Sequence, residues 1–193
     1  MATRSNIVQK AYKCLDEIYP DSQLPNEIEE FRVADFVDDA MRFIGRVAPV
    51  RALGAGEDFS LLLRKGNKIL LPAGFVRLIA FKMSDWVLPV TDALYSDDPR
   101  YRQQANSVLK GTPKRPIVFI CEGGKSLEYY SSATDATVAT AQAFVVDDSE
   151  DIYPEQLSDV IAWKTAELVL SAMNDAQGVQ FAQNQIQQQL QAL

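Results

Sequence analysis

Residues 117–131 read IVFICEGGKSLEYYS. The apolar run 117–121 and the tyrosine-containing run 127–131 flank the turn Glu122-Gly123-Gly124-Lys125. Short runs rich in β-branched and aromatic residues, joined by a glycine-containing turn, are typical of a β-hairpin. The stretch therefore predicts two antiparallel strands and places a sheet in the middle of the fold.

Further strands are predicted on both sides of this hairpin. The shorter apolar runs are residues 59–63, 68–71 and 87–90, and the longer ones are residues 75–83 and 138–146. The start of 75–83 could also begin a helix, and the alanines of 138–146 leave helix open as well. Residues 99–110 are more polar and predict a short helix or a loop.

Helices are predicted at both ends of the chain. Apolar residues recur at helical spacing over 5–19, and again from Pro25 until Gly45 and Pro49 end the pattern. Pro154 suits the first turn of a third helix, which contains Trp163 and breaks near Asn174-Asp175.

The order of these elements defines the expected fold class. It is α+β: an N-terminal helix pair, a small, mostly antiparallel sheet, and a C-terminal helix with an extended tail. Strands and helices do not alternate as in a nucleotide-binding fold. Residues 1–175 are expected to form a single domain, and residues 176–193 the tail.

The composition predicts a globular protein without cofactor, metal or membrane span. Of 193 residues, 47% are hydrophobic and 23% are charged. The chain begins without a secretory signal and contains no apolar run of membrane length, so synthesis in the cytoplasm is expected. Cys14 and Cys121 are expected to be reduced core residues.

Two features of the charged residues narrow the function. Histidine is absent, which removes the commonest general base and transition-metal ligand but leaves carboxylate chemistry and Mg²⁺ sites open. Together with an incomplete phosphate-binding motif and the lack of paired acids, this predicts that the protein is not an enzyme. Residues 1–115 carry 17 basic and 15 acidic side chains, a net charge of +2. Residues 116–193 carry 2 basic and 11 acidic side chains, a net charge of −9. An acidic half disfavours a protein that grips DNA phosphates.

Motifs that could carry chemistry each have a simpler explanation. Gly124-Lys125-Ser126 resembles the end of a phosphate-binding loop, but Phe119 stands where that motif needs glycine, so a hairpin turn is favoured. Gly54-Ala55-Gly56 is a loop. The acids at 147–151 could bind Ca²⁺ or Mg²⁺, but acids are also stabilising before a helix. The aromatic side chains could line a pocket, or serve as core and interface anchors.

The C-terminal tail is the candidate docking element. Residues 176–193 contain eight glutamines and one asparagine but no charged side chain. Such a surface can dock without desolvating charges, while a frayed terminus is the alternative. The candidate partner-docking residues are Val179, Phe181, Ile186, Leu190 and Leu193.

Several short motifs between residues 25 and 174 resemble those of a viral protein family. They are the run 70–79 with Pro72 and Phe75, the segment Trp86-Val87-Leu88-Pro89-Val90, the polar stretch 101–106, the pair 116–118 and 127–131, and Tyr153-Pro154-Glu155 before Trp163. In this order they resemble the head-to-tail connector, or adaptor, ring proteins of short-tailed bacteriophages, particularly the crAss-like group.

That resemblance implies a structural virion protein at the head–tail junction. It would form a ring of about twelve copies beneath the portal protein, contact further ring or tail proteins, and line the channel through which genomic DNA passes without specific binding. It implies that the C-terminal helix docks on the portal. An acidic lumen would let the duplex pass without adhering.

Two other functions remain open. A tail-completion or tail-tube subunit would share the lack of active-site residues but would have longer strands and less helix. A carboxylate-dependent enzyme acting on a small molecule would need a pocket with two facing acids.

Overall fold

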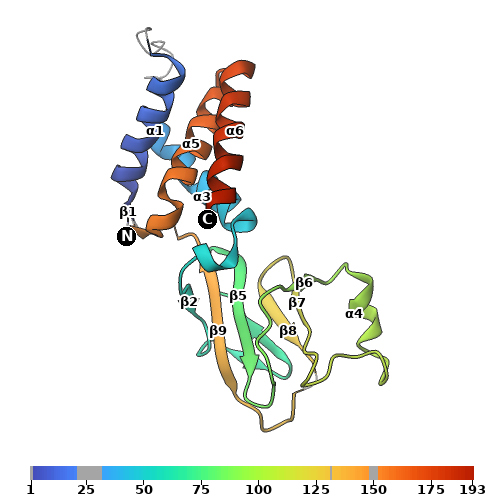
Figure 1. Cartoon of the computed structure of the whole chain (residues 1–193). Helices are drawn as coiled ribbons and strands as arrows, with labels where there is room; N and C mark the ends of the chain where they lie inside the picture. The colour runs from blue at the N-terminus through green and yellow to red at the C-terminus, as the bar shows by residue number, and fades with distance from the viewer. Residues whose placement is uncertain (1, 21–31, 131, 148–151) are drawn as a thin grey trace. The chain divides into compact units, whose positions relative to one another are not determined.

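A computed structural model describes residues 2–20, 32–130, 132–147 and 152–193. The fold is α+β, as predicted. Contacts gather into two compact units: a helical unit, Met1–Gly54 with Val146–Leu193, and a sheet unit, Ala55–Val145 (Figure 1). The sequence predicted one domain over residues 1–175 with a separate tail, whereas these units divide the chain by the kind of secondary structure.

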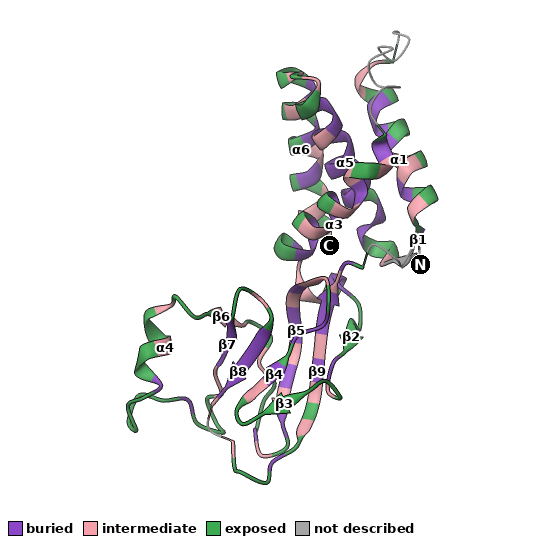
Figure 2. Cartoon of the chain, turned by 180° about the vertical axis from the view of Figure 1, so that it is seen from behind, coloured by how far each residue is buried: buried purple, intermediate pink, exposed green. Residues whose placement is uncertain are grey.

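The helical unit is organised around one central helix. Its elements are β1 (Ala2–Thr3), α1 (Arg4–Ile18), the 3₁₀ turn η1 (Val33–Phe36), α3 (Val37–Val47), the 3₁₀ turn η2 (Val50–Ala52), β10 (Ile152–Tyr153), the 3₁₀ turn η3 (Glu155–Leu157), α5 (Ser158–Ala172) and α6 (Ala176–Ala192). Helix α5 contacts α1, α3 and α6. Because it is apolar on nearly all sides, it is buried along most of its length (Figure 2).

Local sequence explains where these helices begin and end. The Thr3 hydroxyl accepts a hydrogen bond from the Asn6 amide at 3.3 Å and caps α1. Helix α3 ends at Val47, two residues before Pro49. Of the helix predicted from Pro25, residues 21–31 lie outside the described part of the chain, and the rest forms η1 and α3.

The sheet unit contains two sheets and one short helix. Its elements are β2 (Glu57–Asp58), β3 (Arg64–Lys65), β4 (Lys68–Leu70), β5 (Phe75–Met83), β6 (Leu94–Tyr95), α4 (Pro99–Gln103), β7 (Val118–Cys121), β8 (Ser126–Tyr129) and β9 (Val138–Val145). One sheet has the order β2-β9-β5 and the other β3-β4-β8-β7-β6. All these pairs are antiparallel except β6 with β7.

The predicted hairpin is confirmed as β7 and β8, and the ambiguous runs 75–83 and 138–146 are strands. Two predicted strands do not form as predicted. Residues 59–63 form a turn, and within 87–90 only Val90 makes a bridge, to Phe81. Neither run alternates between buried and exposed positions, which is the condition for pairing on one face of a sheet.

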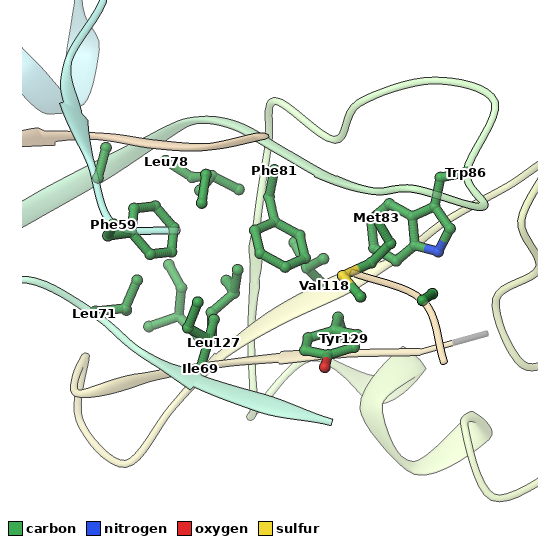
Figure 3. Packing of buried hydrophobic residues seen from close by; sticks show 14 residues of the cluster. Phe59, Ile69, Leu71, Leu78, Phe81, Met83, Trp86, Val118, Leu127 and Tyr129 are labelled. Carbon is green, nitrogen blue, oxygen red and sulfur yellow. The ribbon is translucent and has the colours of Figure 1, made fainter. Parts of the chain in front are cut away.

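Aromatic side chains fill the core of the sheet unit. The ring of Phe81 lies 6.3 Å from Phe59, 5.7 Å from Trp86 and 5.5 Å from Tyr129, measured between centroids. Figure 3 shows these four side chains converging with Met83 between the two sheets. Trp86, which belongs to one of the motifs that carry the family resemblance, is therefore a core residue of the sheet unit.

Candidate interaction surfaces

Helix α6 is started by a tightly held cap. Asn174 adopts φ 59°, which ends α5 and turns the chain. One carboxylate oxygen of Asp175 accepts hydrogen bonds from the amides of Gln177 and Gly178, both at 3.1 Å, and the other accepts one from the Tyr19 hydroxyl. These bonds lower the pKa of Asp175, the Tyr19 bond first. The tail predicted to begin at residue 176 is therefore an ordered helix.

The apolar stripe of α6 packs against its own chain. Ile186 is buried, Phe181 lies 5.9 Å from the Trp163 ring, and Val179, Leu190 and Leu193 are half-buried. Because Ile186 is buried and Val179, Leu190 and Leu193 are half-buried, the exposed side of α6 is mainly amide, and Phe181, 39% exposed, is a large apolar side chain on it. That surface carries no charged side chain of α6.

A buried polar cluster joins α6 to α5 and α3. Lys164 and Glu167 pair within α5, and both are nearly inaccessible to solvent. The Gln183 side-chain amide donates to Glu167 at 3.1 Å, and the Lys164 ammonium lies 4.0 Å above the Phe43 ring. The hydrogen bond from Gln183 links α6 to the buried ion pair on α5.

A first exposed apolar surface lies on residues 59–63, called the leucine loop below. Phe59 is buried in the core, and the amide of Leu70 donates to the carbonyl of Leu63 at 3.1 Å. Between these anchors Leu61 and Leu63 are 98% and 70% exposed. The loop is shaped by its own hydrogen bonds and still presents leucines to solvent.

A second apolar surface lies beside β6. A cavity of about 550 Å³ has apolar lining from Val90, Leu94, Val108, Leu109 and Ile117, and basic lining from Arg100, Lys110 and Arg115. We call it the basic pocket. Its loop is fixed by Gln104, which donates to the Arg100 carbonyl and accepts from the Gly111 amide, both at 2.9 Å.

A third feature is a buried carboxylate that the sequence analysis did not single out. Glu128 on β8 accepts hydrogen bonds from Tyr130 at 2.5 Å, Tyr101 at 3.0 Å and Asn67 at 3.1 Å. Burial raises the pKa of Glu128, but these donors outweigh it and the pKa lies below its usual value. All three donors belong to the sheet unit, so the cluster ties α4 to β8. A single acid between Leu127 and Tyr129 in a predicted strand was the available signal.

The other predicted motifs occupy structural positions. Glu122, Gly123 and Gly124 have positive φ and form the hairpin turn before β8, as predicted. Residues 148–151 of the acidic cluster lie outside the described residues. Elsewhere in the described chain, no three Cys, Asp or Glu side chains gather closely enough to hold a metal ion.

The remaining motif residues are spread over both units. Pro72 is buried, and its carbonyl accepts from the amide of Phe75, which is half-buried at the start of β5. Pro89 is exposed in the loop before Val90. Pro154 precedes η3, and Trp163 is buried in α5. Within each unit, these motif residues occupy positions in the core, at element boundaries or in loops.

Charge separates between the two units. The helical unit carries 8 basic and 17 acidic side chains, a net of −9, and the sheet unit carries 11 and 9, a net of +2. Seven of these 17 acids lie outside the described residues, so the described part of the helical unit carries 8 basic and 10 acidic side chains, a net of −2.

Comparison with known proteins identifies no relative: no family model matches the sequence, and no curated protein matches it. Over the part of the chain that the structure describes, none of the helices has both the length and the apolar character that crossing a bilayer requires.

Proposed function

We propose that this chain is a structural assembly subunit that forms a ring and joins a phage head to its tail. The observation that carries the proposal is the exposure of apolar side chains on fixed backbone, at the leucine loop and at Val108 and Leu109 of the basic pocket. Exposed apolar patches on an ordered surface are typical of protein interfaces.

The resemblance to connector proteins supports the particular assembly. In that role about twelve copies would surround the channel beneath the portal protein at the head–tail junction of the virion and contact further tail or ring proteins. The net charge of −9 on residues 116–193 of the sequence supports a channel wall that repels DNA phosphates.

Helix α6 is the proposed portal-docking element. Its stripe is held by α5, so the docking surface is the opposite, amide-rich side, with exposed Gln180, Gln187 and Gln191. An uncharged amide surface can form hydrogen bonds to a partner without removing water from a charged group.

The structure sharpens the test of this docking. Deleting residues 177–193 would uncover Trp163 and the Lys164–Glu167 pair, so a loss of binding could reflect unfolding.

The triple variant Gln180→Glu, Gln187→Glu and Gln191→Glu changes only exposed side chains. We expect it to remain folded and to lose binding to the portal protein of the same genome in size-exclusion chromatography. A matched variant, Gln9→Glu with Lys13→Glu on α1, makes the same change in net charge at exposed positions and keeps the binding. Unchanged binding by the triple glutamate variant would contradict docking through α6.

A further inference from the structure

The two edges of the five-stranded sheet carry unlike surfaces. Strand β3 is at one edge and β6 is at the other. The leucine loop runs directly into β3, and Leu94 of β6 lines the basic pocket. Both surfaces belong to the sheet unit and lie at opposite ends of a single sheet.

The leucine loop is an exposed apolar surface with an acidic flank on its N-terminal side and a basic flank, Arg64 and the exposed Lys65, on its C-terminal side. Asp58 accepts a 2.8 Å hydrogen bond from the Ser60 amide, which tightens the turn and lowers the pKa of this exposed carboxyl. Glu57, also exposed, precedes it. On the other side, Arg64 donates to the Ala136 carbonyl at 2.8 Å and lies 5.5 Å from the Tyr129 ring, so its guanidinium is held by its own chain.

The basic pocket has the complementary character. Its apolar lining can receive aliphatic side chains, and Lys110 and Arg115 are exposed beside that lining. Arg100 is already paired with Asp98 at 2.8 Å, and Asp92 is a single acid in the lining. Lys110 and Arg115 are therefore the charges that best match an acidic partner.

We infer that the leucine loop of one copy inserts into the basic pocket of the next copy. Leu61 and Leu63 would contact the apolar lining, and Glu57 and Asp58 would approach Lys110 and Arg115. This contact is heterologous, because two different patches meet, and repetition of such a contact closes a ring when the rotation allows it. The two edge strands, β3 and β6, have only two residues each. Side chains therefore make most of the contact, and backbone pairing between edge strands of neighbouring copies contributes little. The inference rests on the proposed ring assembly and names its contact between neighbours.

Disulfide trapping tests the pairing directly with the full-length chain as its own probe. One variant carries Leu61→Cys and another carries Val108→Cys; both positions are exposed. The native Cys14 and Cys121 are buried. Under mild oxidation at high protein concentration, a mixture of the two variants is expected to give a cross-linked dimer, and either alone only traces. The double variant in one chain is expected to give a ladder of higher oligomers.

Matched variants separate this contact from random collision. Val47→Cys, on α3 of the helical unit and 48% exposed, is expected to cross-link with neither partner. Leu63→Asp in the Leu61→Cys chain removes an apolar contact, and we expect the cross-linking yield to fall about tenfold or more. Glu57→Lys in that chain lowers the yield, and Arg115→Glu in the Val108→Cys chain restores it.

Two results would overturn the inference. Leu61→Cys alone dimerising as well as the mixture would make the contact isologous, and absence of the mixed dimer at the highest soluble concentration would remove the contact altogether. The portal-binding test is independent of both. If the chain binds the portal but gives no mixed dimer, the proposed function stands and this contact is refuted. If the mixed dimer forms but the chain does not bind the portal, this contact stands and the proposed portal docking is refuted.

Discussion

The ring of Phe181 on α6 lies 5.9 Å from the ring of Trp163 on α5. Through this contact, and through Gln183 on Glu167, the C-terminal helix is part of the helical unit before any partner binds. A partner that docks on α6 therefore meets a preformed surface and does not have to order a tail at the cost of binding energy.

The first prediction concerns this contact. Phe181→Ala removes an aromatic pair and the apolar area that the ring covers, and we expect the free energy of unfolding to fall by about 1–3 kcal/mol. Asn184→Ala changes an exposed residue of the same helix and should shift the free energy of unfolding by less than about 0.5 kcal/mol. Urea denaturation measures both. Equal stability of the two variants would show that α6 is not packed as described.

The second prediction concerns the start of α6. Asp175→Ala removes the acceptor for two backbone amides, so we expect a loss of about 1–2 kcal/mol. Since the pKa of Asp175 is lowered from 3.8 in the folded chain, its contribution is fully present above that value and is lost as the pH falls below it. The stability gap between wild type and variant should therefore shrink in acid. A gap that widens below pH 3.8 would contradict the cap.

The third prediction concerns the buried carboxylate. Glu128→Leu leaves the hydroxyls of Tyr101 and Tyr130 without their acceptor, and we expect a loss of about 2–4 kcal/mol. Glu122 is an exposed partner of Lys68, so Glu122→Gln should change stability much less than Glu128→Leu does. Because the folded pKa of Glu128 lies below 4.5, the wild-type advantage persists above that pH and disappears as the pH falls through the folded pKa. A Glu128 variant as stable as the Glu122 variant would refute the structural role.

The fourth prediction separates the anchor of the leucine loop from its tip. Phe59→Ala empties a buried site, at a cost of about 3–5 kcal/mol, whereas Leu61→Lys should change stability by about 0.5 kcal/mol or less, because Leu61 contributes almost nothing to the core. Thermal unfolding compares the two. A large loss in Leu61→Lys would mean that the loop folds back on its own chain.

The fifth prediction concerns the thiols. Burial raises the pKa of Cys14 to about 12 and also raises the pKa of Cys121, so both remain protonated at neutral pH. We expect neither to react with a thiol reagent at pH 7.5 in the native protein, and both to react in denaturant. Rapid labelling of the native chain would contradict the buried positions.

The sequence predicted the elements whose signals are local. The hairpin of 117–131 has its turn glycines between an apolar run and a tyrosine-containing run, and the helices have regular spacing and prolines at their boundaries. The strand predicted at 59–63 was wrong, because composition cannot distinguish an apolar run that faces a core from one that faces solvent, as Leu61 does.

The surfaces were less accessible to sequence analysis. The apolar stripe of α6 was found by its spacing, but spacing does not tell whether α5 or a partner covers it. The basic pocket combines Val90, Leu94 and Val108 from three separate segments, and Glu128 draws its donors from Asn67, Tyr101 and Tyr130. Only the fold brings such residues together.

Negative-stain electron microscopy of the chain mixed with the portal protein of the same genome tests the central claim most directly. A ring subunit predicts particles with extra density at one end of the portal, and class averages along the axis that show rotational symmetry. Portal particles without added density, while the chain remains folded and monomeric, would contradict the account.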